Sequence, residues 1–183
     1  MPADFPTQML RDIRHALAPR PLPARMAPDA AATLPATPGT YLLLLRLDAP
    51  LPLRGRFTGE TLPSGHYAYA GSARGPGGLR ARLWRHLRRE KAIRWHIDQL
   101  TTRAMALAAL PFPDDDFLKG HGARLTECAL AAALLRAGSF AIPLPGFGSS
   151  DCPTCPAHLL RWTGPAAHTP SPLVGKGRGG GSA

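Results

Sequence analysis

A dense run of basic residues follows two alternating tyrosines in GHYAYAGSARGPGGLRARLWRHLRREKAIRWHI, residues 65–97. From Arg74 to Arg94 this stretch holds eight basic residues and one acid, in a chain whose net charge is +10. Clustered cations gain free energy by displacing the counterions held by phosphates, and an arginine fork can hold two phosphate oxygens at once. The glycine-rich turn GSARGPGG leads into the expected helix, where free backbone amides would form a seat for an anion. The pattern predicts contact with a phosphate polyanion, and a solvated helix face is the alternative.

Apart from Arg82, which is considered below, the basic residues of this stretch are predicted to bind the nucleic-acid backbone. They are Arg74, Arg80, Arg85, Arg88, Arg89, Lys91 and Arg94.

Five elements of the chain, in order, resemble the GIY-YIG endonucleases. The tripeptides Gly39-Thr40-Tyr41 and Tyr69-Ala70-Gly71 are similar to the two that name the family, and GLRARLWRH is similar to its arginine helix. The motifs GPGGL, RHLR, WHID and GFGSSDC resemble those of one prokaryotic branch of that family. The resemblance covers roughly residues 39–135 and implies an endonuclease that cleaves nucleic-acid phosphodiester bonds, with DNA as the expected substrate. The catalytic residues that it implies are Tyr41, Tyr69, Arg82, His86 and Glu127.

Cleavage of a phosphodiester needs a polarised phosphate, an activated water and a stabilised leaving oxygen. Arg82 would supply charge to the phosphate, and the resemblance implies that Tyr41 and Tyr69 orient or deprotonate the water. His86 follows Arg82 by one turn, so both project from the same side of a helix. The structural alternative is that the tyrosines are core aromatics and that Arg82 and His86 are ordinary surface residues.

Glu127 opens the apolar helix sequence ECALAAALL. A carboxylate there is costly to bury unless it is paired or binds a cation, and Mg²⁺ or Mn²⁺ is the expected cofactor because one protein carboxylate can anchor it. Alternatively, Glu127 caps the helix with Thr126. The chain has no asparagine, the residue that usually follows this helix in the family, and Ser149, Ser150 or Asp151 could replace it. The difference leaves open a non-catalytic nucleic-acid-binding module of the same fold.

Two residues of the WHID motif, His96 and Asp98, form a second tier of candidates. They suggest a metal or acid–base role, but an aspartate near a helix start beside a partly buried histidine is more commonly structural.

The turn DCPTCPAH has the spacing of three zinc ligands, Cys152, Cys155 and His158. A structural Zn²⁺ site needs four ligands, so Cys128 or His121 would have to come from elsewhere in the fold. The alternative is that the cysteines simply pack in a tight turn. A zinc-stabilised interaction protein is therefore a further functional hypothesis.

The elements that must position these residues follow from the hydrophobic pattern. TYLLLLRL and HYAYAGSA predict neighbouring strands, with a short strand around residues 54–58 between them and a β-like segment, AMALAAL, later. Leucines at 79, 83 and 87 predict an amphipathic helix, another helix is expected to begin near Ile93, and residues 126–136 predict a third. The fold class is therefore α/β (α+β), a small mixed or antiparallel sheet flanked by helices, GIY-YIG nuclease-like by resemblance.

The 183 residues suit one hydrophobic core. We expect a Pro/Ala-rich arm with a short helix over 1–38, the nuclease-like domain over 39–163 and a disordered Gly-rich tail over 164–183. The chain shows no signal peptide, and its apolar runs are shorter than the ~20 residues of a membrane span, which predicts a cytoplasmic protein, nucleoid-associated through its charge, with no membrane partner. Recruitment by a repair or recombination protein is a further hypothesis, and the sequence leaves the oligomeric state open.

Overall fold

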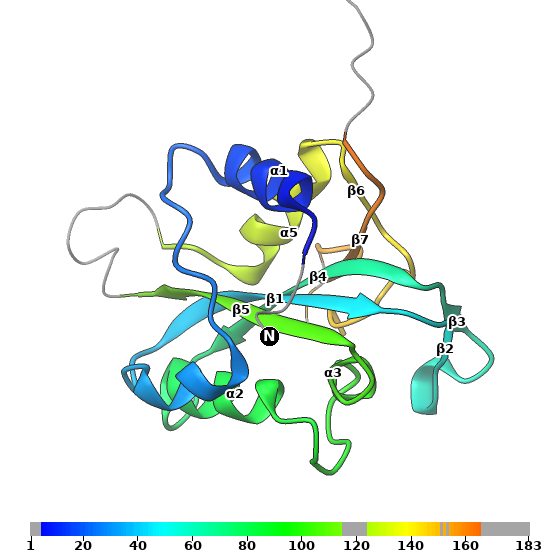
Figure 1. Ribbon diagram of the computed structural model, residues 1–183, viewed down its shortest axis with the longest axis horizontal. Helices are drawn as coiled ribbons and strands as arrows, with labels where there is room; N and C mark the ends of the chain where they lie inside the picture. Colours follow the sequence, from blue (N-terminus) through cyan, green and yellow to red (C-terminus); the bar gives the residue numbers. More distant parts are fainter. Residues whose placement is uncertain (1–4, 115–123, 151, 153, 166–183) are drawn as a thin grey trace, which may run out of the picture.

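The computed structural model of the chain describes residues 5–114, 124–150, 152 and 154–165. Within these residues the main sheet has five strands, all paired antiparallel, in the order β5-β1-β4-β7-β6 (Figure 1). Its strands are β1 Gly39–Leu47, β4 Gly65–Ala73, β5 Ala106–Pro113, β6 Phe140–Ala141 and β7 Leu159–Trp162, and a separate ladder joins β2 Leu51–Pro52 to β3 Thr61–Leu62. The helices are α1 Thr7–Leu17, α2 Gly78–Leu87, α3 Asp98–Thr101 and α5 Glu127–Arg136, with 3-10 turns η1 Pro28–Thr33 and η2 Gly55–Phe57.

Strand β1 lies inside the sheet, between β4 and the edge strand β5. Its sequence is a nearly continuous apolar run because both faces are covered, and all but one of its nine residues are buried. The antiparallel register pairs Tyr41 with Gly71 on β4 and with Pro111 on β5. The prediction that TYLLLLRL and HYAYAGSA form neighbouring strands is confirmed.

Helices cover both faces of the sheet, as Figure 1 shows, with α1 and α5 on one side and α2 and α3 on the other. Alternation along β1 divides its side chains between the two layers: Leu43 and Leu45 join the core under α2, whereas Leu42 and Leu44 join the core under α1 and α5. The predicted class, a small mixed or antiparallel sheet flanked by helices, is confirmed, and every strand pair of the main sheet is antiparallel.

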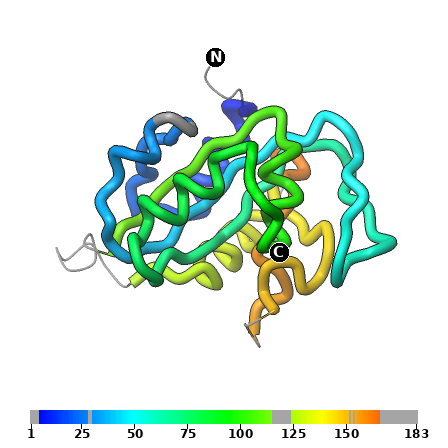
Figure 2. Tube along the Cα trace, turned by 90° about the horizontal axis from the view of Figure 1, so that it is seen from below, coloured from blue at the N-terminus to red at the C-terminus, as the bar shows by residue number. Residues whose placement is uncertain are grey.

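The N-terminal segment, expected to form an arm, packs against the rest of the molecule. Its short helix is α1, whose Met9, Ile13 and Leu17 are buried in the core shared with α5. Met26 then forms a β-bridge with Ala109 on β5, and Figure 2 shows this segment along one end of the molecule. The predicted tail lies outside the described residues from position 166 onward.

Two element predictions are corrected. The short strand expected around residues 54–58 is replaced by the 3-10 turn η2, because Gly55 adopts a positive φ of 70° that an extended strand does not allow, and the short strands β2 and β3 flank this turn instead. The helix expected near Ile93 begins only at Asp98, and Ile93 is 54% exposed.

The start of α5 is as predicted. The hydroxyl of Thr126 accepts a hydrogen bond from the backbone amide of Ala129 at 3.1 Å, and Gly138 follows the helix with a φ of 74°. None of the helices in the described part of the chain has the length and apolarity that crossing a bilayer requires.

Candidate active site and metal centre

The residues predicted to be catalytic converge on one pocket. It has a volume of about 360 Å³, and the predicted residues that line it are Tyr41, Tyr69, Arg82, His86 and Glu127. A larger pocket of about 670 Å³ lies between β2 and α3, but none of the predicted site residues lines it. We therefore assign the candidate site to the smaller pocket, which all five residues predicted to be catalytic line.

The pocket forms where the sheet opens. Strand pairing between β4 and β7 covers Tyr67 to Tyr69, and the amide of Ala70 donates to the carbonyl of His158, so among the described residues β4 has no strand partner on this side from Gly71 to Ala73. At this edge α2 approaches from one face of the sheet and the first turn of α5 from the other. Ser72 of β4 donates a hydrogen bond to Oε1 of Glu127 at 3.1 Å, which orients the carboxylate from the α5 side.

The rings of Tyr41 and Tyr69 each occupy space that a side chain at a neighbouring glycine would fill. A Cβ on Gly71 would overlap the ring of Tyr41, its cross-strand neighbour. Gly148 has a φ of +76°, and a Cβ there would lie 2.5 Å from Cε2 of Tyr69. Each ring therefore lies directly on a glycine backbone, which explains physically why a glycine follows the second tyrosine by two residues.

Tyr41, His86 and Asp98 form a buried polar chain. The hydroxyl of Tyr41 lies 2.9 Å from Nε2 of His86, and Nδ1 of His86 lies 3.9 Å from Oδ1 of Asp98. We assign the imidazole proton to Nδ1, because the carboxylate favours a proton on the nearer nitrogen and cannot donate one. Nε2 is then the acceptor for the hydroxyl of Tyr41.

Burial controls the protonation of this chain. It lowers the pKa of His86 to about 3, reinforced by the charge of Lys91 and opposed by Asp98, so the imidazole is neutral near pH 7. Burial also raises the pKa of Tyr41 well above its usual value and that of Tyr69 to about 12, although Arg82 opposes both shifts. Both phenols therefore keep their protons in the free protein.

Asp98 is the internal anchor of the loop before α3. Its side chain is fully buried, and Oδ2 accepts hydrogen bonds from the backbone amides of Arg94 and Trp95 at 2.9 and 3.0 Å and from Arg85 at 2.5 Å. Burial alone would raise the pKa of Asp98, but these amides, with Lys91 and Arg85, outweigh it and lower the pKa. These contacts agree with the prediction that Asp98 has a structural role.

The predicted phosphate contacts divide into internal and exposed residues. Lys91 is internal, because its side chain is 4% exposed and donates to the carbonyls of Arg85 and His86, and burial lowers its pKa to about 8. This does not agree with its predicted contact to a phosphate. Arg85 forms a salt bridge with Asp98, and Arg74 forms one with Asp114 at 2.6 Å.

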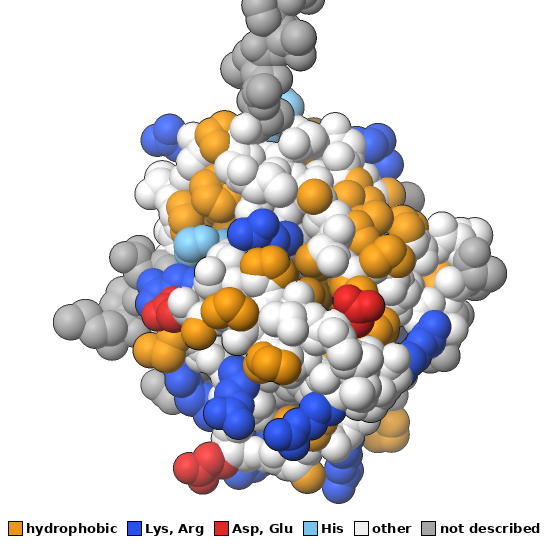
Figure 3. All heavy atoms as spheres, turned by 90° about the vertical axis from the view of Figure 1, so that its right-hand side faces the viewer, with side chains coloured by type: hydrophobic (Ala, Val, Ile, Leu, Met, Phe, Trp, Pro, Cys, Tyr) orange, Lys and Arg blue, Asp and Glu red, His pale blue; other side chains and the backbone are white. Residues whose placement is uncertain are grey.

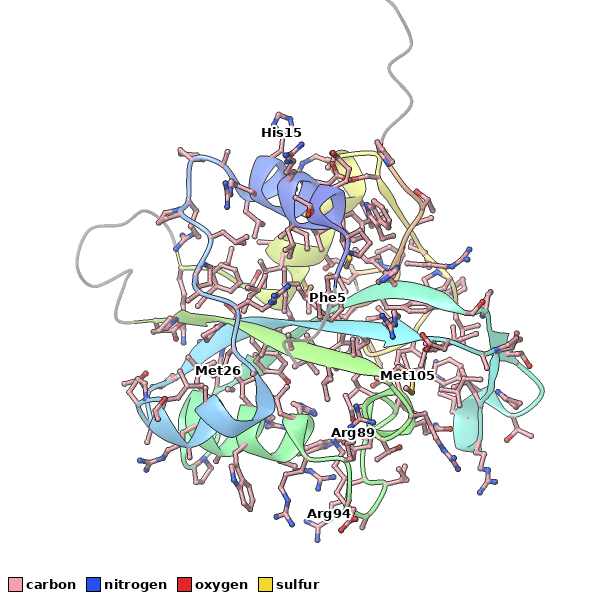
Figure 4. All side chains as sticks on the ribbon, in the orientation of Figure 1. Phe5, His15, Met26, Arg89, Arg94 and Met105 are labelled. Carbon is pink, nitrogen blue, oxygen red and sulfur yellow. The ribbon has the colours of Figure 1, made fainter. Side chains whose placement is uncertain are left out.

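Arg89 donates to the carbonyl of Met105 at 3.0 Å, and Figure 4 shows both residues near the start of β5. The remaining three, Arg80, Arg88 and Arg94, are exposed, and Figure 4 shows Arg94 pointing away from the sheet. On the face shown in Figure 3, basic side chains gather in the lower half, the side on which α2 and α3 lie in Figure 1.

The backbone amides of the first two residues of α2, which follow the glycine-rich turn, are not free to bind an anion. The amide of Gly78 donates to the carbonyl of Gly75 at 3.1 Å, and that of Leu79 donates to the carbonyl of Thr37 at 2.9 Å. None of these residues lines the candidate pocket. The phosphate seat predicted at this turn is therefore corrected, because the turn serves to attach α2 to the segment before β1.

Three of the second-tier residues also lie at the pocket. His96, Ser149 and Ser150 line it, and Asp151 lies outside the described residues. Trp95 was missed by the sequence analysis although it lines the pocket and lies under the guanidinium of Arg82, 4.4 Å from its ring centroid. A tryptophan directly before the WHID histidine, beside an arginine-rich helix, was the available signal.

A second cluster, of three cysteines and one histidine, could hold a metal ion. It consists of Cys128, Cys152, Cys155 and His158, and we call it the Cys3His cluster. One ligand atom from each residue lies within 4.8 Å of every other, a combination typical of zinc. The sequence left two candidates for the fourth ligand. Cys128 belongs to the cluster, and His121 lies outside the described residues.

Comparison with known proteins gives one match. Residues 40–171 match a family described as domain of unknown function DUF123. No curated protein and no solved structure matches the chain.

Proposed function

The chain belongs to the DUF123 family, and we propose that this member is a divalent-metal-dependent endonuclease that cleaves DNA. One observation carries the proposal: two tyrosines, an arginine, a histidine and a glutamate from separate stretches of the chain line one pocket. The resemblance of the same residues to the GIY-YIG endonucleases supports the choice of phosphodiester chemistry. For this function we expect the protein to lie in the cytoplasm, associated with the nucleoid.

Glu127 fits a Mg²⁺ or Mn²⁺ ion. Its carboxylate is oriented by Ser72 and lines a pocket with room for waters and phosphate oxygens, which supply most of the ligands of such ions. When bound, the ion would polarise the phosphate and offset charge on the leaving oxygen.

Tyr41 and His86 provide a route for the proton of the attacking water. The water gives its proton to the oxygen of Tyr41 while the hydroxyl proton of Tyr41 passes to Nε2 of His86, 2.9 Å away. The resulting imidazolium faces Asp98 at 3.9 Å. A phosphate beside Arg82 raises the proton affinity of His86, because the anion offsets the cations that help to lower the pKa of the free imidazole.

Arg82 and Tyr69 would hold the phosphate. Trp95 supports the guanidinium of Arg82 from beneath and limits its freedom, so the charge is held in place before the substrate arrives. Tyr69 keeps its proton, with a pKa of about 12, and can therefore donate a hydrogen bond to a phosphate oxygen. Contacts with the DNA backbone beyond the pocket fall to the exposed Arg80 and Arg88, and the exposed Arg94 would hold the backbone at the pocket itself, which it lines.

A nicking assay on supercoiled plasmid with Mg²⁺ or Mn²⁺ tests the proposal. Arg82→Ala and Glu127→Gln should each reduce the nicking rate by about 100-fold or more, the usual loss when one transition-state contact is removed. Arg14→Ala is the matched control, because Arg14 is exposed on α1, away from the pocket. This variant should nick at the wild-type rate.

Two results would overturn the assignment. Equal nicking by wild type and both pocket variants would place the activity elsewhere or in a contaminant. Salt-sensitive DNA binding without nicking, in either metal, would instead favour a non-catalytic binding module of the same fold.

A further inference from the structure

We propose that the Cys3His cluster is a structural zinc site that fastens the wall of the candidate pocket. The four residues come from two segments that are distant in sequence. Cys128 is the second residue of α5, whereas Cys152, Cys155 and His158 lie in the connection that leads into β7. An ion held by all four would cross-link the first turn of α5 to this connection.

The distances between ligand atoms fit a tetrahedral ion. With Zn–S bonds of about 2.3 Å and Zn–N bonds of about 2.0 Å, neighbouring ligand atoms lie about 3.5–3.8 Å apart. In the structure, Sγ of Cys128 lies 3.2 Å from Sγ of Cys152 and 3.6 Å from Nε2 of His158. The two sulfurs would separate by a few tenths of an ångström to admit the ion. Their distance is well beyond the about 2.05 Å of a disulfide, and all three cysteines are free.

The surrounding backbone already holds the ligands in place. The amide of Cys155 donates to Sγ of Cys152 at 3.3 Å, so the CxxC turn is closed onto its own first sulfur. The carbonyl of His158 accepts from Ala70 on β4 at 2.9 Å, and its amide donates to Phe147 at 2.9 Å. The histidine is 5% exposed and is therefore fixed against the sheet.

The ligand set indicates zinc in a structural role. Thiolates and imidazole suit Zn²⁺, whereas Mg²⁺ and Ca²⁺ take oxygen ligands. Four protein ligands fill a tetrahedral shell and leave no position for substrate, which is the arrangement of structural rather than catalytic zinc. This ion would be distinct from the one proposed at Glu127.

The cluster is part of the pocket wall. Cys152 and His158 line the pocket together with Gly148, on which the ring of Tyr69 lies. Cys128 directly follows Glu127 in the first turn of α5. A metal cross-link here would therefore fix Glu127 relative to Tyr69, two groups that come from different layers of the fold.

Metal analysis of the full chain tests the site without reference to nuclease activity. Protein purified without chelators from zinc-supplemented cells should contain about one zinc per chain, and this content should be lost in Cys128→Ser and His158→Ala. His15→Ala is the control, because His15 lies on the outer side of α1 (Figure 4) and should leave the zinc content unchanged.

Three measurements on the wild-type chain keep the test valid if the ligand variants fail to fold. Co²⁺ should replace the ion with the visible absorption of a tetrahedral thiolate site, and bound metal should protect all three thiols from alkylation. Removal of the metal should speed amide exchange at residues 127–130 and 147–150 more than in α1. Wild-type protein with less than about a tenth of an equivalent of zinc, three reactive thiols and no Co²⁺ spectrum would overturn the proposal.

Discussion

Replacement of Asp98 by alanine should destabilise the protein far more than loss of an ordinary surface acid. The substitution removes the acceptor of two backbone amides, those of Arg94 and Trp95, and the anion that faces Arg85 and Lys91. Water cannot replace the carboxylate readily, because its side chain is fully buried.

The expected loss can be worked from these contacts. A buried donor left without an acceptor costs about 1–3 kcal/mol, and removing one partner of a buried ion pair costs about 3–5 kcal/mol in total. We therefore expect Asp98→Ala to lower the free energy of unfolding by about 3–5 kcal/mol, a large part of the about 5–15 kcal/mol typical of a domain. Asp98→Asn keeps an oxygen for the amides and should lose about half as much.

Urea denaturation followed by circular dichroism provides the measurement, with Asp48→Ala as the matched control. Asp48 pairs with Arg46 at 2.8 Å, but its side chain is 50% exposed, so its loss should cost no more than about 1 kcal/mol. The three variants should therefore rank Asp98→Ala, Asp98→Asn and Asp48→Ala in decreasing order of damage, with similar m-values. If Asp98→Ala loses no more stability than Asp48→Ala, the view of Asp98 as the anchor of this loop is refuted.

Three further predictions concern protonation, backbone strain and charge. The folded-state pKa of Tyr69 is raised to about 12 from 10.0. Its contribution to stability is therefore fully present below pH 10 and is lost as the pH rises toward 12. Absorbance titration should show tyrosinate forming at a higher pH in the folded chain than in the urea-unfolded chain. Gly148→Ala should destabilise more than Gly59→Ala, since both positions have a positive φ but only at Gly148 does the added Cβ meet a ring, and equal melting temperatures would contradict this. Arg80→Ala should weaken DNA binding uniformly across sequences and reduce the salt dependence of the dissociation constant by about one ion, and an unchanged slope would remove Arg80 from the interface.

Much of the fold could be predicted because the longer strands and helices follow from local patterns of apolar residues. The apolar run of β1 required a strand buried on both faces, the leucine spacing at 79, 83 and 87 required a helix with one buried side, and Thr126 marked the start of α5. Local patterns were weaker in the connections. Helix α3 spans only four residues, and η2 replaced an expected strand, because such short elements depend on tertiary contacts more than on periodicity.

The candidate site was predicted in part for the same reason. Motif residues such as Tyr41, Arg82 and Glu127 were selected because their motifs resemble those of the GIY-YIG endonucleases, and that resemblance is what suggests phosphodiester chemistry. Their charge environments could not be predicted in this way. Lys91 belongs to the basic run by sequence, yet the fold buries its ammonium beside Asp98, because α2 and the loop before α3 close over it.

The sequence by itself determined the longer elements, such as β1, β4, α2 and α5, and the motifs that resemble those of phosphodiester-cleaving enzymes, since both are local to the chain. Only the tertiary structure decided that Cys128 joins the cysteine turn, that Gly148 supports Tyr69 and that Glu127 lines the same pocket as the two tyrosines. Periodicity fixes the side of an element on which a residue lies. The distance between residues of different elements depends on the path of the whole chain.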